Sequence, residues 1–214
     1  MFSKLVKRRF GKGPETCYVS LKGMRLYVYL KSYLTPAEEV LLESDELYLA
    51  HKFRSKVINA VIKEFIPEVS EVLGVEFDRF YHDWNCDTNT GMILLENGFS
   101  NDVAKIDMPF ERELAQLIEK VGMHYHKSPS QLKVVKYTHN ICAIELKEVL
   151  SQLEELVFKK GNMDLLLYQS IEIKRGYMMH KIQFEDLFPR IIEDLFMLWD
   201  YENDRNYLVF VFTR

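Results

Sequence analysis

The sequence repeats itself, and this repeat constrains the fold more than any other feature. Leu34-Thr35-Pro36-Ala37-Glu38-Glu39-Val40 is matched 116 positions later by Leu150-Ser151-Gln152-Leu153-Glu154-Glu155-Leu156. Trp84 is matched by Trp199, at an offset of 115. Such self-similarity predicts two copies of one structural unit, since each copy must bury its own hydrophobic face. We expect two domains, residues 1–107 and 108–214, joined near residues 98–108.

Each copy shows the same order of predicted elements. A short amphipathic helix comes first, followed by two β-rich runs, two helices and a closing hairpin. In the first copy we predict a helix around Phe2–Val6, strands at Cys17–Leu21 and Arg25–Leu30, a long helix at Glu46–Leu73, and strands at Val75–Asp83 and Met92–Leu95. In the second copy the helix is Phe110–Val121, the strands are Leu132–Tyr137 and Ile141–Leu146, the long helix is Asp164–Leu198, and the last strands are near Leu198–Tyr201 and at Tyr207–Phe212.

Two local signals fix points within this pattern. Thr35 and Ser151 suit a helix N-cap, and the glutamate three residues later, Glu38 or Glu154, completes a capping box. Pro67 and Pro189 lie inside the long helical patterns, so each predicts a kink or a break.

This order of elements predicts the fold class. Runs of strands followed by helices, without strict alternation, are typical of α+β proteins. We expect two tandem α-ββ-αα-ββ units with antiparallel sheets, each with its helices packed on one face, related by a pseudo-two-fold axis.

Composition excludes several classes of function. The 214 residues carry 28 basic and 32 acidic side chains, a net charge of −4, so no global basic field favours nucleic acid. The cysteines, Cys17, Cys86 and Cys142, lie outside any CxxC motif, which predicts reduced thiols rather than disulfides or a zinc site.

The hydrophobic runs are all interrupted by charges. None reaches the ~20 apolar residues that a membrane-spanning helix requires. The basic N-terminal stretch lacks the apolar core of a secretory signal. We therefore expect a cytoplasmic protein with no membrane span.

Several segments of the first copy resemble the MpsC-like family. They are Phe10-Gly11-Lys12-Gly13-Pro14-Glu15, the helix start Leu34-Thr35-Pro36-Ala37-Glu38, Arg54, and the turn His82-Asp83-Trp84-Asn85-Cys86-Asp87-Thr88-Asn89-Thr90. This family comprises small bacterial domains of unknown biochemical function, named for a link to a sodium-translocating, membrane-potential-generating system. The resemblance covers roughly residues 1–97 and implies a fold and a membrane-transport context, but no catalytic residues. The second copy resembles the family only through the repeat.

Two groups of residues are candidates for anion binding. Gly11, Lys12 and Gly13 form a basic glycine-rich turn that could cradle a phosphate or a carboxylate, although a phosphate loop follows a strand and this turn follows a helix. The alternative is a plain helix C-cap. Arg54 lies among apolar residues on a helix and needs a carboxylate partner or an anionic ligand. Glu15 and Glu38 are the candidate partners.

The N-terminal helix carries a run of basic residues, Lys4, Lys7, Arg8, Arg9 and Lys12. This run could contact an anionic membrane surface or a nucleic acid. Because its apolar residues correspond to those of the helix that opens the second copy, we favour a core-facing helix with a solvated basic face.

Metal and nucleophile patterns are weak. Asp83, Asn85, Asp87 and Asn89 alternate as calcium ligands do, but an EF-hand loop also needs Gly at its sixth and Glu at its twelfth position. His124 and His126, with His139 in the next turn, have no acid or cysteine nearby to complete a metal site. The pair Cys86 and His82 lacks an orienting acid. We expect no metal, no cofactor and no catalytic site.

These patterns favour a non-enzymatic accessory or regulatory protein that acts through protein–protein contacts, either with a partner or by self-association. Its context would be a membrane ion or inorganic-carbon transport system, with peripheral association. The alternative is a small-anion sensor that holds bicarbonate or a carboxylate with Arg54 and Lys12 in a cleft within or between the copies. A metal-dependent hydrolase is a third hypothesis, which would require a bound metal.

Overall fold

The structure is a computed structural model that describes residues 1–99, 106 and 108–213. The chain divides into two compact units, the first unit Met1–Asp102 and the second unit Val103–Arg214. The boundary predicted between residues 107 and 108 falls in a stretch most of which lies outside the described residues.

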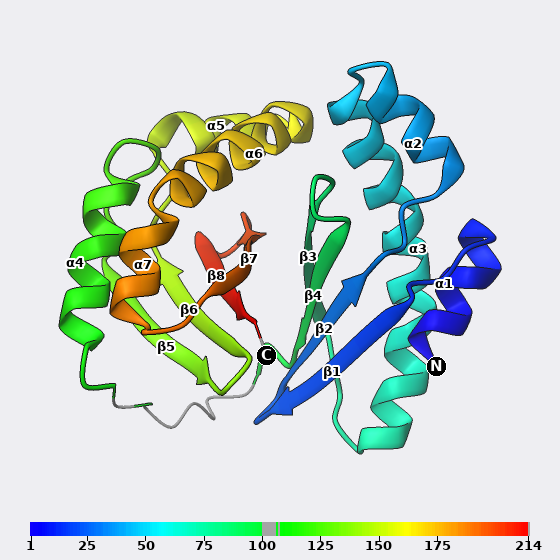
Figure 1. The fold of residues 1–214 in the computed structure, drawn as a ribbon, viewed down its shortest axis with the longest axis horizontal. Coiled ribbons are helices and arrows are strands. Elements are labelled where there is room, and N and C mark those ends of the chain that lie inside the picture. Colours follow the sequence, from blue (N-terminus) through cyan, green and yellow to red (C-terminus); the bar gives the residue numbers. More distant parts are fainter. Residues whose placement is uncertain (100–105, 107, 214) are drawn as a thin grey trace. The chain divides into compact units, whose positions relative to one another are not determined.

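The first unit is an α+β fold around a four-stranded antiparallel sheet (Figure 1). The strand order is β1-β2-β4-β3, so the closing hairpin pairs with the second strand of the opening hairpin. Its elements are α1 (Phe2–Phe10), β1 (Thr16–Lys22), β2 (Arg25–Lys31), α2 (Pro36–Glu43), α3 (Leu47–Leu73), β3 (Arg79–Asn85) and β4 (Thr90–Glu96).

The second unit repeats this topology with the strand order β5-β6-β8-β7. Its elements are α4 (Glu111–Gly122), β5 (Gln131–Tyr137), β6 (Ile141–Lys147), α5 (Gln152–Lys159), α6 (Met163–Met179), α7 (Lys181–Leu187), β7 (Ile192–Asp200) and β8 (Arg205–Phe212). The predicted α+β class, with two antiparallel sheets built from a repeated order of helices and strands, is confirmed. The pseudo-two-fold relation stays a prediction.

Both units turn the chain in the same way at one corner. Ser32 and Glu148 follow the second strand of each unit, and both have φ of 55°. Their backbone N–H groups donate, each over 2.9 Å, to the carbonyls of Asn89 and Asp204 in the closing hairpins. Asn89 and Asp204 also have positive φ, at 51° and 47°. The repeat therefore extends to backbone conformations that few non-glycine residues adopt.

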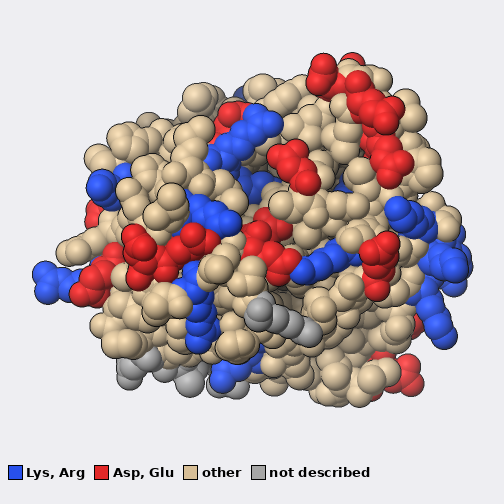
Figure 2. Space-filling view, viewed as in Figure 1, with Lys and Arg blue, Asp and Glu red and all other residues tan. Residues whose placement is uncertain are grey.

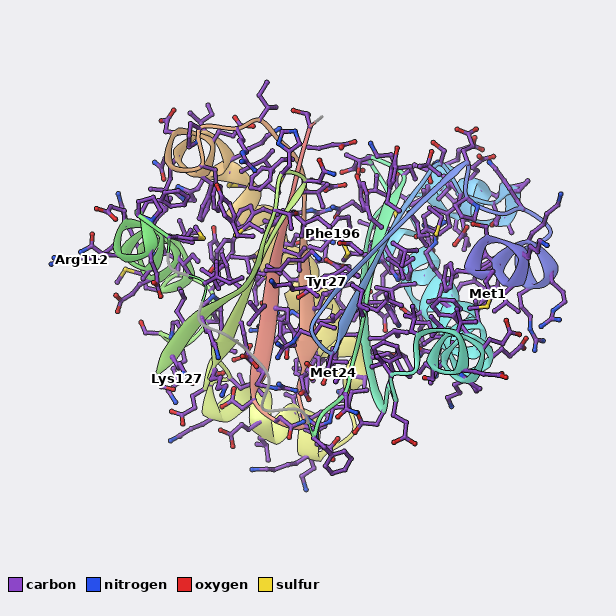
Figure 3. The ribbon with its side chains drawn as sticks, turned by 90° about the horizontal axis from the view of Figure 1, so that it is seen from below. Met1, Met24, Tyr27, Arg112, Lys127 and Phe196 are labelled. Atoms are coloured by element: carbon purple, nitrogen blue, oxygen red, sulfur yellow. The ribbon has the colours of Figure 1, made fainter. Side chains whose placement is uncertain are left out.

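Successive side chains of a strand point to opposite faces of the sheet, so every second residue faces the helices. In the first unit Leu26, Val28 and Leu30 belong to the same core as the apolar residues of α1 and α3. Tyr27, between them, lies on the face away from the helices, as Figure 3 shows. In the second unit Leu195 belongs to the helix-side core, and Phe196 lies on the opposite face (Figure 3).

One prediction about the second unit is wrong. The helix expected over Asp164–Leu198 ends at Leu187 and is divided at His180 into α6 and α7, while Ile192–Asp200 is a strand. Apolar residues in this strand occur three and four apart, as in a helix, and burial on both faces removes the alternation typical of a strand. Pairing with β8 along its length makes it a strand.

The two proline predictions have different outcomes. Helix α3 continues through Pro67 without a break. In the second unit the helical pattern does break at Pro189, which lies between the end of α7 and the start of β7. The strand expected from Val75 begins at Arg79, because Gly74 ends α3 in a left-handed conformation and the next residues run to the sheet before they pair with β4.

Helix α3, with 27 residues, is long enough in principle to cross a bilayer, but charged residues interrupt it. Within the part of the chain that the structure describes, no helix combines the length and apolar sequence of a membrane span.

Candidate functional site

The candidate site in the first unit begins at the N-cap of α2. Thr35 has an extended backbone, and its Oγ1 accepts from the backbone N–H of Glu38, which gives the predicted capping box. In return, the Glu38 carboxylate accepts from the Thr35 backbone N–H over 2.9 Å and from the Thr35 hydroxyl over 2.7 Å. The local sequence thus fixes the position of a carboxylate that is 1% exposed.

Arg54, on α3, completes this site. Its Nε and Nη2 both donate to the Glu38 carboxylate, the latter over 2.7 Å, so the pair is bidentate. Of the two partners considered from the sequence, Glu38 rather than Glu15 is the one that Arg54 contacts. The guanidinium Cζ lies 4.3 Å from the ring centroid of Tyr33 and 5.7 Å from that of Trp84. Aromatic rings at such distances stabilise a desolvated cation.

Burial and charge act in opposite directions on this pair. Burial by itself raises the pKa of Glu38, but the hydrogen bonds and charge of Arg54 outweigh it and hold that pKa below its usual value. Burial likewise lowers the pKa of Arg54, but the hydrogen bond and charge of the Glu38 carboxylate help to raise it above the usual value. Both side chains are therefore charged at neutral pH. Burial also raises the pKa of Tyr33, so its phenol is neutral.

The Arg54–Glu38 ion pair connects α3 to α2, and the contact of Arg54 with the Trp84 ring connects α3 to the sheet. Arg54 is 1% exposed, and two of its three nitrogens are bound to Glu38. Its third nitrogen, Nη1, is buried and makes no hydrogen bond to any residue that the structure describes. The pair holds the two helices together through complementary charges, and solvent does not reach it.

The second unit builds the same corner without an arginine at the position that corresponds to Arg54. Ser151 caps α5, and Glu154 forms the same capping box. The residue 116 positions after Arg54 is Ser170, whose Oγ accepts from Trp199 Nε1 over 2.9 Å. Glu154 accepts instead from the Gln169 amide, over 2.7 Å. The buried capping glutamate is common to both units, and the Arg54–Glu38 ion pair is found in the first.

The other predicted anion candidates lie at the end of α1. Gly11 is the left-handed C-cap of that helix, as the alternative interpretation of this turn expected. Lys12 Nζ donates to the Leu34 carbonyl over 2.9 Å. Gly11, Lys12 and Gly13 also line an open hollow. Arg54 does not line this hollow, so the structure does not bring Arg54 and Lys12 together there.

Sequence reasoning missed which side chains surround these groups. The rings of Tyr33 and Trp84 lie over the Arg54 guanidinium. In the sequence, Tyr33 stands out only as a residue close to the capping box, and Trp84 only as a residue that the repeat matches. Lys4 and Lys7 line the hollow with Lys12, because the glycine turn folds back onto α1.

The histidines and cysteines form different pairs from those considered. His82 Nε2 contacts the Asn59 side-chain oxygen at 2.8 Å, and the neighbour of Cys86 is His51, whose Nε2 lies 3.5 Å from the sulfur. His126 lies between the Lys127 carbonyl and the Tyr177 hydroxyl, each at 2.8 Å. Within the described ranges, no three His, Cys, Asp or Glu side chains are grouped as metal ligands would be.

Comparison with known proteins bears on the unit that carries the ion pair. Residues 1–96 match the MpsC family. The family model is described as "Na+-translocating membrane potential-generating system (MpsC)", and its match ends with β4, so it covers the first unit and less than half of the chain. The second unit resembles the first in topology but is not part of the match. No curated protein matches the chain. No solved structure matches it either.

Proposed function

We propose that this protein is a non-enzymatic accessory protein that acts through protein–protein contacts, and that its partner is a protein of a membrane ion-transport system. The proposal depends on one observation: each unit exposes apolar side chains on its pair of helices, at corresponding positions. The fold does not need these side chains, because each sheet already has a separate core beneath its helices.

The corresponding positions are related by the repeat. Val40 on α2 is 59% exposed, and Leu156, 116 residues later on α5, is 51% exposed. Leu49 on α3 is 45% exposed, and Leu165, again 116 residues later on α6, is 53% exposed. Single exposed leucines are ordinary, but recurrence at the same places in both units indicates a surface that both use.

The α5–α6 pair of the second unit has the larger set. We call these residues the α5–α6 apolar surface: Leu153, Leu156, Met163, Leu165 and Tyr168, each at least 45% exposed. Methionine and tyrosine are enriched at protein interfaces, and burying several such side chains supplies much of the energy of a contact. This surface therefore suits an apolar face of another protein.

The family context supports the choice of partner. The description of the matched family names a sodium-translocating system that generates a membrane potential. An accessory protein for such a system, or for an inorganic-carbon transporter, would bind it from the membrane surface. The alternative partner is a second copy of this chain, bound through the same surface.

The test replaces the apolar surface with charge. In the double variant Leu156→Glu and Leu165→Glu, we expect loss of any co-purifying transport protein from the native cell, with the fold retained because both side chains are half-exposed. Gln152→Glu, at an exposed position of the same α5 helix, is the matched control. Retention of the same partners by the double variant would refute the proposal. Sedimentation velocity on the purified wild type tests self-association separately.

The small-anion sensor stays a prediction. Arg54 forms an ion pair with Glu38, so a carboxylate of the protein already occupies the place that the sensor hypothesis gave to a bound anion. No observation favours bicarbonate at that position. A thermal-shift comparison of bicarbonate and carboxylates would test this alternative, with Lys12→Gln as the variant, since Lys12 is exposed.

A further inference from the structure

The N-terminal end of the first unit concentrates positive charge. Five basic side chains, those of Lys4, Lys7, Arg8, Arg9 and Lys12, are exposed on or directly after α1. The sequence has no acidic residue before Glu15. Figure 2 shows Lys and Arg side chains gathered over α1, at the right edge of the view. This concentration stands out in a chain whose net charge is −4.

The five charges are not equivalent. Arg8 and Arg9 each donate to one oxygen of Glu64 on α3, so this carboxylate partly neutralises both arginines. Lys4 and Lys7 form no ion pair with any described residue, and Lys12 contacts only an uncharged carbonyl. Of these five basic side chains, the three lysines are therefore the ones with no carboxylate partner in the described part of the chain.

These three lysines line one hollow. Its volume is about 500 Å³, and its walls are Ser3, Lys4, Lys7, Gly11, Lys12, Gly13 and Pro14. One wall is the face of α1, and the other is the turn that folds back after the helix. The hollow thus brings together residues from the start of the helix and from beyond its end.

Glycine is required for this arrangement. Gly11 has φ of 75°, which reverses the chain at the end of α1. A Cβ at Gly13 would lie 2.9 Å from the Ser3 carbonyl oxygen and 3.3 Å from the Lys7 Cβ. The turn therefore packs directly against the helix, and a side chain at position 13 would push it, with Lys12, away from Ser3 and Lys7 on α1.

Packing against the core does not require the positive charge of α1. Helix α4 of the second unit occupies the corresponding place in the order of elements, and it carries three glutamates, Glu111, Glu113 and Glu119, beside two basic residues, Arg112 and Lys120. Since α4 packs its apolar face on its own core with these acidic residues, a basic helix is not needed for packing. The charge on α1 calls for another role.

We propose that this hollow, the three-lysine hollow, binds a phosphate group. Lysine ammonium groups act as point charges that suit a multiply charged, tetrahedral oxyanion. The arginines, whose planar forks suit carboxylates and phosphates alike, are already held by Glu64. The end of α1 contributes a partial negative charge of about half an electron, which three ammonium charges outweigh. None of the residues that line this hollow belongs to the apolar surfaces of the proposed function.

Two sources could supply the phosphate: a soluble phosphate compound or the headgroup of an anionic lipid. Titration of the full chain with inorganic phosphate, at constant ionic strength maintained with chloride, tests the first by isothermal calorimetry. Co-sedimentation with vesicles of phosphatidylcholine, with and without phosphatidylglycerol, tests the second. Binding in either arm supports the site, and the arm that responds identifies the source.

The double variant Lys4→Gln and Lys7→Gln links binding to the hollow. We expect affinity to fall about fivefold for each lysine, the equivalent of about 1 kcal/mol per basic residue near a phosphate surface. Lys56→Gln, which removes an exposed charge from α3 in the same unit, should leave binding unchanged. Absence of binding in both arms, or equal binding by wild type and double variant, would overturn the proposal. Far-UV circular dichroism checks that the variants fold.

Discussion

The two units place a buried glutamate at the same point of the same corner, and they satisfy it differently. In the first unit Glu38 binds the guanidinium of Arg54, which lies between Tyr33 and Trp84. In the second unit Glu154 binds the neutral amide of Gln169. Capping box, positive-φ corner and strand order are otherwise shared.

This difference separates what the fold requires from what one unit adds. The corner forms when the buried capping glutamate has hydrogen-bond donors, and these donors need not be charged. In the second unit the Gln169 amide is such a donor to Glu154. Arg54 is therefore an addition of the first unit, which is also the unit that matches the MpsC family. Substitutions at corresponding positions can test how far the two units differ.

The largest difference in stability between the two units should appear when one side chain of the pair that holds each capping corner is removed, because in the first unit this leaves Arg54 without its carboxylate. Glu38→Ala leaves Arg54 buried and unpaired, and we expect a loss of about 4 kcal/mol in the free energy of unfolding. Gln169→Ala removes a hydrogen bond to Glu154, with an expected loss of about 1 to 2 kcal/mol. Urea denaturation of each full-length variant measures both values.

A second variant shows whether the cost comes from the unpaired charge. Replacing both members, Glu38→Gln and Arg54→Met, removes the ion pair as a whole and should cost less than Glu38→Ala alone. Equal losses for Glu38→Ala and Gln169→Ala would contradict the view that the units differ here.

The next contrast concerns the strand position opposite each tryptophan. Gly91 pairs with Trp84, and a Cβ there would lie 2.1 Å from the indole ring and 2.4 Å from the Tyr33 hydroxyl. Since neither ring can move without disturbing Arg54, Gly91→Ala should cost about 3 kcal/mol. The shift in the thermal midpoint measures the loss.

The control for that variant is the corresponding position of the second unit. Asn206 pairs with Trp199, and its side chain is buried with no hydrogen bond to any of the described residues. Asn206→Ala should leave stability unchanged or raise it, because it removes an unsatisfied polar group. A Gly91→Ala variant as stable as the wild type would show that the first unit tolerates a side chain there as well.

A smaller contrast depends on pH. Burial lowers the pKa of His82 from 6.5 to about 4, and its Nδ1 has no partner among the residues described. A lowered pKa means that the neutral form stabilises the fold above pH 6.5 and that this stability is lost as pH falls toward 4. We expect a loss of about 2 kcal/mol across that range, measured by urea denaturation at pH 7 and pH 4.5.

The second unit supplies the replacement for this test. Its residue at the corresponding position is Met197, so His82→Met should flatten the pH dependence. Burial also lowers the pKa of His126 in the second unit, which leaves a residual acid effect in both proteins. His124→Gln, at an exposed position, should change nothing. The idea fails if His82→Met retains the full dependence of the wild type.

The sequence by itself determined the features that depend on neighbours along the chain. Both capping boxes, both opening hairpins and the repeated order of elements were predicted, because a cap or a tight turn depends on residues only a few positions apart. The hairpin signals placed the first two strands of each unit within one residue of the observed ends. The surface lysines were visible too, as a run of basic residues.

Tertiary structure decided everything that depends on distant partners. Ile192–Asp200 fits a helix or a strand by its own residues, and β8 makes it a strand by supplying its hydrogen bonds. Arg54 had two candidate carboxylates, and the packing of α2 against α3 selected Glu38. The repeat marked Trp84 without indicating that it lies over a cation. Such pairings depend on the path of the whole chain, and no local pattern of residues encodes that path.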